Sequence, residues 1–266
     1  MNSEQETPEV EYLRAVLLID EVHLDLAREV VRAGEPSINM DFCSEDGDRA
    51  IFTVNGLDHL VRYLREPLDS AHLDFVIESS LFWDGKPRPE HSARILIRRP
   101  RSQHRLMDLL ALTDVVYALT RKIPTRAIVW MPYNAISLEN FDGYYDQLYT
   151  IGFIPVCIWV KFHVFLIKGK PSVMTFGLEP LGLKELEFET TFENLSIDVN
   201  IAQNVIDRAL RGGLDFPEGS VLGIDIFETQ GSLTVRHRPS ILGNGRVACF
   251  LEFNYLTGGH PTPGVH

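Results

Sequence analysis

The stretch that most constrains the fold lies in the second half of the chain, at residues 175–189. It reads Thr-Phe-Gly-Leu-Glu-Pro-Leu-Gly-Leu-Lys-Glu-Leu-Glu-Phe-Glu. We expect it to begin as a strand, turn through Gly177, Pro180 and Gly182, and leave as a second strand, because glycine and proline punctuate β-type runs. The sequence therefore predicts a strand–turn–strand unit around which the other elements are arranged.

The second of these strands carries a regular row of carboxylates. Successive side chains of a strand point to opposite faces of a sheet, so Leu186 and Phe188 share one face. The other face carries three glutamates: Glu185, Glu187 and Glu189. We interpret this row as the solvated outer face of a half-buried strand. It could instead meet cations, either Arg236 and Arg238 on a neighbouring strand or a basic partner protein.

Glu179 stands immediately before Pro180, within the turn of this unit. The residue before a proline is pushed toward an extended backbone. We expect the Glu179 carboxylate to accept backbone N–H bonds and so fix the turn. Binding of a ligand or partner, and general acid/base catalysis, are the alternatives for this residue.

The same residues carry a resemblance to a known family. The pattern Gly-Leu-Glu-x-x-Gly-x-x-Glu, followed by a helix and short strands, resembles the bacterial domain-of-unknown-function family numbered 4261. Its five fixed positions are Gly177, Leu178, Glu179, Gly182 and Glu185. The resemblance is best over residues 172–253 and looser upstream, where the family pattern tends to carry a histidine at His91. It implies a shared fold and no established activity.

Hydrophobic patterns predict the other elements. Buried-type strands are expected near residues 12–20 and 127–131, and amphipathic helices at about 103–121 and 196–211. We also predict short helices after Asp20 and over residues 57–64, a strand over 73–83, and a hairpin over 162–178. Mixed strands and helices with hairpins indicate an α+β fold: mixed or antiparallel sheets with helices packed on one face, or two similar sandwich halves.

Length and terminal composition suggest the domain organisation. We expect residues 1–11 to be a disordered tail, residues 12–253 one compact unit, and residues 254–266 a flexible tail. A subdivision near 168–172 is conceivable, although the predicted hairpin would cross it. The acidic N-terminus is unlike a signal peptide and favours a cytoplasmic location.

Composition excludes several classes of function. The net charge of −12 argues against binding of nucleic acid or of an anionic membrane. The three widely spaced cysteines, Cys43, Cys157 and Cys249, indicate neither a disulfide framework nor a zinc site. We expect no metal and no cofactor, and the sequence holds no phosphate-binding loop or nucleophile elbow.

Two further positions are candidate site residues. Trp130 and Tyr133 follow a predicted buried strand, and they suit either core packing or a protein interface, where such residues are enriched. His91 begins a predicted strand, and either a structural hydrogen bond or an alternative polar site would explain it. No catalytic residue is assigned.

Three hypotheses of function follow. The first is a non-enzymatic bacterial binding protein, in its concrete form an immunity protein that neutralises a basic secreted toxin through an acidic surface. The second is a hydrolase or transferase that uses Glu179, Glu185 and His91. The third is an adaptor or structural subunit that assembles through exposed strand edges.

Overall fold

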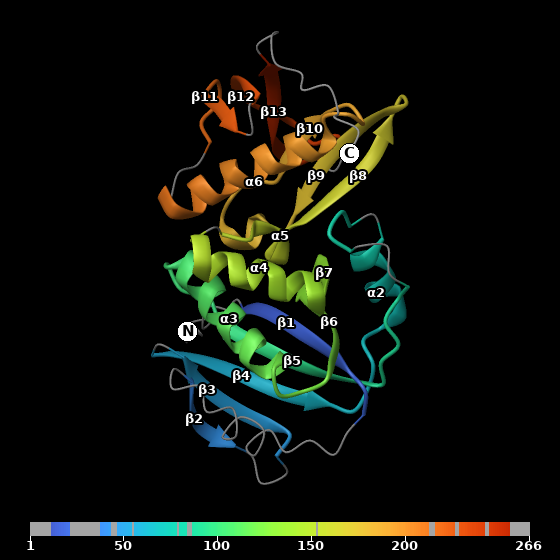
Figure 1. Ribbon diagram of the computed structural model, residues 1–266, viewed down its shortest axis with the longest axis vertical. Coiled ribbons are helices and arrows are strands. Elements are labelled where there is room, and N and C mark those ends of the chain that lie inside the picture. The colour runs from blue at the N-terminus through green and yellow to red at the C-terminus, as the bar shows by residue number, and fades with distance from the viewer. Residues whose placement is uncertain are drawn as a thin grey trace, which may run out of the picture.

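The computed structural model describes residues 12–21, 38–43, 47–54, 56–78, 80–83, 87–152, 154–212, 216–226, 229–242 and 245–255. In this part of the chain two β-sheets lie one above the other, and helices lie on and between them (Figure 1). The predicted α+β fold is therefore confirmed. The helix predicted after Asp20 and the predicted tail at residues 1–11 fall outside the described residues, as do residues 256–266.

The first half of the chain builds a seven-stranded antiparallel sheet with the order β2-β3-β4-β5-β1-β6-β7. Its strands are β1 (Tyr12–Ile19), β2 (Ile38–Cys43), β3 (Arg49–Val54), β4 (Leu57–Leu64), β5 (Ala93–Pro100), β6 (Thr125–Met131) and β7 (Asn134–Ser137). Strand β1 lies between β5 and β6, and its apolar run is buried on both faces, as predicted.

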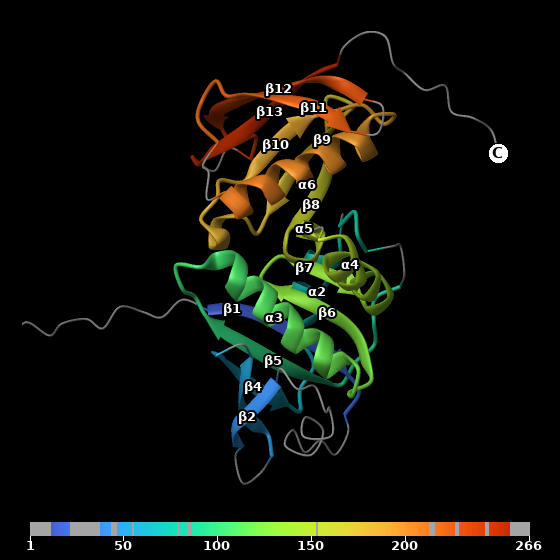
Figure 2. The ribbon, with the colours of Figure 1, turned by 60° about the vertical axis from the view of Figure 1, so that its left-hand side comes forward.

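Helices cover both faces of this sheet. Helix α3 (Arg105–Thr120) packs on one face through Leu109, Leu112 and Val116, and α4 (Leu138–Ile151) lies beside it. Helix α2 (Ser70–Ile77) packs on the opposite face through Leu73 and Val76. Figure 2 shows α3 running along the sheet.

The second half builds a six-stranded mixed sheet with the order β11-β12-β13-β10-β9-β8. Its strands are β8 (Lys161–Ile167), β9 (Lys170–Phe176), β10 (Leu186–Glu189), β11 (Val221–Ile226), β12 (Thr229–Pro239) and β13 (Val247–Tyr255). All its pairs are antiparallel except β10 with β13. The predicted hairpin is confirmed as β8–β9, and it crosses residues 168–172.

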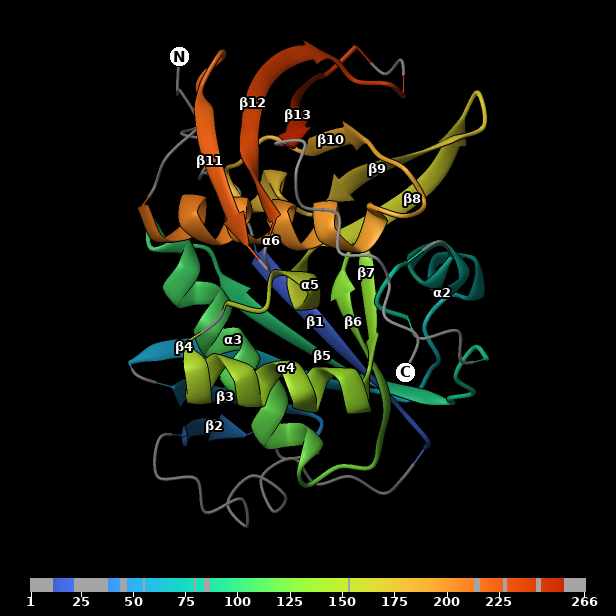
Figure 3. The same ribbon diagram turned by 45° about the horizontal axis from the view of Figure 1, so that its top comes forward.

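The long helix α6 (Leu195–Gly212) packs on one face of the second sheet and lies between that sheet and the first half of the molecule (Figure 3). The short helix α5 (Val156–Trp159) lies where the two halves meet. One continuous cluster of buried apolar residues runs through both halves. Side chains also donate across the boundary: Trp159 Nε1 to Thr113 Oγ1 at 3.0 Å and Lys161 Nζ to the Phe75 carbonyl at 2.7 Å.

Two local predictions are wrong. Residues 57–64 form strand β4: Gly56, with φ +76°, precedes it, the strand pairs antiparallel with β3, and every second side chain is buried. Residues 70–77 form helix α2 in place of a strand, because the Asp69 carboxylate accepts from the His72 amide and caps a helix start.

Candidate functional site

Glu185 occupies the centre of the turn that the sequence singled out. Its Oε1 accepts backbone N–H bonds from Gly177 and Leu178, both at 2.9 Å, and from Glu179 at 3.2 Å. Its Oε2 accepts from the Thr175 hydroxyl at 2.7 Å. The carboxylate of Glu185 therefore fixes the turn, a task that we had expected of Glu179.

The backbone that wraps Glu185 requires two glycines. Gly177 has φ +113°, and a Cβ there would lie 3.0 Å from the Trp159 carbonyl oxygen. Gly182 has φ +72° and ends the short 3₁₀ helix η1 (Glu179–Leu181). These positive φ angles favour glycine. The spacing from Gly177 to Glu185 is thus the sequence signature of a loop closed by its own carboxylate.

The loop at residues 177–183 is also held from the first half of the chain. Arg105, at the start of α3, donates from Nη1 to the Leu181 carbonyl at 2.8 Å, and Arg101 donates to the Pro180 carbonyl. These bonds supply donors to carbonyl groups that lack a partner at the end of a short helix. The loop therefore connects the two halves of the molecule.

Glu187 is buried, with a residual exposure of 1%. Its Oε1 accepts from the Ser240 hydroxyl at 2.5 Å and its Oε2 from the Ile241 amide at 3.0 Å. A buried carboxylate requires such donors, because burial without them is costly. Glu187 therefore anchors the segment after β12 on this face of the sheet.

The prediction of a solvated glutamate face is wrong for two of its three members. Glu185, Glu187 and Glu189 do share one side of the strand, but Glu185 and Glu187 lie beneath loops and bind them. Only Glu189 is exposed. The alternation of side chains along a strand predicts which of them share a face. It does not predict whether a distant segment of the chain covers that face.

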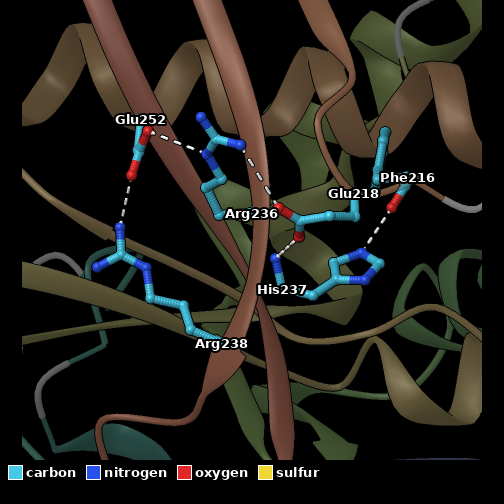
Figure 4. A network of polar contacts seen from close by, with 6 residues as sticks. All are labelled: Phe216, Glu218, Arg236, His237, Arg238 and Glu252. Carbon is cyan, nitrogen blue, oxygen red and sulfur yellow. Dashed lines mark hydrogen bonds and ion pairs between the residues drawn. The ribbon is translucent and has the colours of Figure 1, made fainter.

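Arg236 and Arg238 do not neutralise this row. They lie on β12, which β13 separates from β10. Both pair with Glu252, at 3.5 and 2.8 Å, and Arg236 also pairs with Glu218 at 3.5 Å (Figure 4). Figure 4 also shows His237 bonded to the Phe216 carbonyl, at 2.7 Å. This network attaches the segment before β11 to β12.

A pocket of about 500 Å³ opens beside these loops. Its walls combine apolar side chains with a few charged ones, as binding pockets do. Tyr133 and Phe176 form an aromatic side, with ring centroids 5.8 Å apart. At the rim Arg246 Nη1 lies 2.7 Å from Glu179 Oε2, and both side chains are about half exposed.

The other residues that line the pocket come mainly from the loops and strands around Glu185 and Ser240. It includes the apolar residues Met174, Leu183, Leu242, Val247 and Ala248, together with Gly182, Lys184, Glu185 and Ser240. Burial raises the pKa of Glu185 to about 7, against the lowering effect of its four hydrogen-bond donors. Lys184 is exposed at the mouth, and its Nζ lies 3.4 Å from His237 Nδ1.

The structure thus brings together three of the predicted site residues: Glu179, Glu185 and Tyr133. Trp130 is 4% exposed and belongs to the core between the two halves, so it offers no surface to a partner. His91 lies in the first half, where its Nε2 accepts from the Leu68 amide at 2.9 Å. This bond gives His91 a structural role and separates it from the pocket.

Sequence reasoning did not identify Arg246, Ser240 or Lys184 as site residues. Ser240 stands 53 residues from its partner Glu187, and Arg246 stands 67 residues from its partner Glu179, so no local pattern signals these contacts. Lys184 stands just before β10, and it is exposed beside the pocket.

Metal-ion and thiol chemistry find little support in the part of the chain that the structure describes. No group of three or more His, Cys, Asp or Glu residues there is arranged to hold a metal ion. Cys157 and Cys249 are buried, and burial raises the pKa of the Cys157 thiol to about 12. Among the described helices, none combines the length and apolar character that a bilayer crossing requires.

Comparisons with known proteins add no relative. No family model matches the chain, and the searches of curated proteins and of solved structures found no match. The resemblance to the family numbered 4261 therefore stays an untested prediction, and the assignment of function depends on the geometry of the site.

Proposed function

We propose that this chain is a non-enzymatic binding protein that engages a basic partner protein at the pocket beside the loop at residues 177–183. Its concrete form is an immunity protein of the bacterial cytoplasm that neutralises a secreted toxin. The proposal replaces a broad glutamate surface by a narrower site, whose exposed carboxylate is Glu179.

The observation that supports binding over catalysis is the state of the pocket's carboxylates. Glu185 accepts four hydrogen bonds and Glu179 pairs with Arg246. Glu187 beneath the pocket accepts two more. A catalytic carboxylate must lie within hydrogen-bond distance of the proton that it transfers. Its oxygens must therefore be able to accept a hydrogen bond from the substrate. These carboxylates instead hold the walls of the pocket in place.

The rim has the chemistry to receive a basic partner. A partner's arginine or lysine could replace Arg246 on Glu179, since that pair is about half exposed and exchanges with solvent at low cost. Tyr133, Phe176 and the exposed Leu242 would then contact apolar parts of the partner. The net charge of −12 would accelerate the encounter.

The test begins with wild-type protein as bait in a native bacterial lysate, followed by identification of the captured protein and calorimetry with the purified partner. We expect Glu179→Lys to weaken binding by at least tenfold, because a like charge then faces the partner's cation. The matched control is Glu193→Lys, which makes the same charge change at an exposed position outside the pocket lining. Equal effects of the two substitutions, or capture of acidic partners only, would contradict the proposal.

One observation favours an enzyme as the second candidate: the raised pKa of Glu185, in a pocket shared with Glu179. An active site made of Glu179, Glu185 and His91 does not fit the structure, because His91 accepts a hydrogen bond from Leu68 in the first half of the chain. Glu185→Gln separates the candidates. A binding protein would keep its partner affinity within a few-fold, whereas an enzyme would lose turnover of its substrate.

A further inference from the structure

Strand β8 forms one edge of the second sheet. It pairs along its length with β9, and the hairpin of these two strands projects from the body of the molecule (Figures 1 and 3). On the other side of β8, within the described residues, the backbone contacts are the bridge from Ser80 to His163 and the bond from the Leu81 amide to the Phe162 carbonyl. Within the described residues, the stretch from Phe165 to Ile167 makes no backbone contact on that side.

The register shows which backbone groups face outward. Ile167 pairs with Lys170 across the two-residue turn Lys168-Gly169, where both φ angles are positive, at 50° and 79°. In such a hairpin the closing pair exchanges hydrogen bonds, and bonded and non-bonded pairs then alternate. The amide and carbonyl groups of Val164 and Leu166 consequently point away from β9. The outward Phe162 carbonyl, which accepts from Leu81, fits this register.

The side chains around this edge are apolar and basic. Leu166 is 62% exposed. Lys168 and Lys170 are exposed on the turn beside it. Residues 160–178 contain no aspartate or glutamate, in a chain whose net charge is −12. The turn of this hairpin is thus a basic stretch of an acidic chain.

We propose that this edge binds an extended acidic segment of a partner protein, which adds as a further strand beside Leu166. Backbone hydrogen bonds would supply affinity and the two lysines would select acidic side chains, as in other strand-addition complexes. A second copy of β8 suits the edge less well, because residues 160–178 offer no carboxylate to Lys168 and Lys170. The site is separate from the pocket and does not depend on the function proposed for it.

The probes are two synthetic peptides, Ac-Glu-Thr-Glu-Val-Glu-Thr-NH₂ and its counterpart with lysine in place of each glutamate. Each is titrated into ¹⁵N-labelled full-length protein. We expect the acidic peptide to bind and to slow hydrogen exchange of the Leu166 amide. The basic peptide should bind at least tenfold more weakly.

Two kinds of variant test the geometry. Leu166→Pro removes an outward-facing amide and leaves the hydrogen bonds to β9. It should therefore lower the affinity for the acidic peptide by about tenfold. Leu166→Val keeps that amide and should change affinity less than threefold. The double variant Lys168→Asp/Lys170→Glu, on an exposed turn, should reverse the preference between the peptides. Circular dichroism verifies that each variant is folded.

Three results would overturn the proposal. One is equal binding of the two peptides by the wild-type protein. Another is unchanged binding of the acidic peptide by folded Leu166→Pro. The third is a concentration-dependent dimer in which the Leu166 amide is already protected without peptide, which would identify a second copy as the occupant.

Discussion

The two halves of the molecule bury polar groups in different ways. In the first half, His59 on β4 is fully buried, and neither ring nitrogen makes a hydrogen bond of ordinary geometry to the described residues. A buried ion pair, Arg99 with Asp108 at 2.8 Å, joins β5 to α3. In the second half, Glu185 and Glu187 are enclosed by donors from loops.

This difference shows which buried polar groups support a surface pocket and which ones support the core. Arg99 and Asp108 fix a helix on a sheet, and His59 is buried on the same sheet. Glu185 and Glu187 instead hold the two loops that border the pocket. Polar groups that rigidify a loop beside a pocket preorganise a binding site, whereas those inside a core chiefly specify packing. The second half is therefore the place to look for recognition.

The largest effect is expected from the buried ion pair of the first half. Asp108→Ala leaves the Arg99 guanidinium buried without its partner, and removes the acceptor for the Ser102 amide at 2.6 Å. Breaking a buried pair in this way costs about 3–5 kcal/mol. Urea denaturation of the variant measures the loss of unfolding free energy.

The control for Asp108 is an exposed pair in the same half. Glu66→Gln removes the partner of Arg94, which lies 2.7 Å away with the glutamate largely in solvent. Such pairs contribute at most about 1 kcal/mol. A loss as small for Asp108→Ala as for Glu66→Gln would show that the first half does not depend on its buried pair.

His59 should make the first half sensitive to acid. Burial lowers its pKa from 6.5 to about 4, and the charge of Arg99 acts in the same direction. Between pH 6.5 and pH 4, His59 is protonated in the unfolded chain but neutral in the folded chain. The free energy of unfolding is therefore highest above pH 6.5 and falls by about 3 kcal/mol as the pH approaches 4. His59→Phe should abolish this component and leave stability at pH 8 unchanged or higher. The measurement is urea denaturation across pH 4–8, and an unchanged acid limb in the variant would refute the assignment.

Glu185 should have the opposite effect in the second half. Burial raises its pKa from 4.5 to about 7, so the folded chain binds the proton more tightly than the unfolded chain. Stability is then full below pH 4.5 and falls by about 2–3 kcal/mol as the pH rises to 7. Glu185→Gln should remove most of this slope. Asp198, whose pKa burial raises to about 6, would leave a smaller slope of the same sign.

The two titrations sharpen the comparison because their signs are opposite over nearly the same pH range. In the wild-type protein they partly cancel, so a flat pH profile would be uninformative by itself. The single variants separate them. If Glu185→Gln and His59→Phe shifted the profile in the same direction, one of the two environments would be misassigned.

Sequence patterns predicted the elements whose periodicity is local. The apolar run of β1 and the spacing of α6 each require one structure, and both are confirmed. Residues 57–64 were ambiguous, because Leu57, Leu60, Val61 and Leu64 fit a helix while the same segment also alternates. The Asn-Gly turn before them was the signal that decides for a strand.

The candidate site could be predicted only in part, for a physical reason. The pattern from Gly177 to Glu185 identified the correct loop, since positive φ angles and a nearby acceptor are local requirements. The cover over Glu187 comes from Ser240, far along the chain, and depends on how β12 and β13 place that segment. Burial of a charge is a property of such long-range packing, so the sequence alone left the glutamates exposed.

The smallest predicted effect tests the connection between the halves at Gly182. An alanine Cβ there would lie 1.5 Å from Arg105 Nη1 and would hold φ at +72°. Arg105 can move aside, but it then loses its bond to the Leu181 carbonyl, and the left-handed backbone costs an L-residue about 1–2 kcal/mol. We therefore expect Gly182→Ala to destabilise the protein by about 2 kcal/mol in thermal or urea denaturation.

The matched control for Gly182 is Gly143→Ala in α4. A Cβ at Gly143 meets no atom within 4 Å, and the residue lies inside a helix. Alanine should stabilise that position by about 0.5–1 kcal/mol, because it loses less conformational entropy on folding than glycine. Opposite signs for the two substitutions would show that Gly182 is required by its backbone and its neighbour from the first half. If both stabilised the protein, the loop at residues 177–183 would not connect the halves as tightly as its contacts indicate.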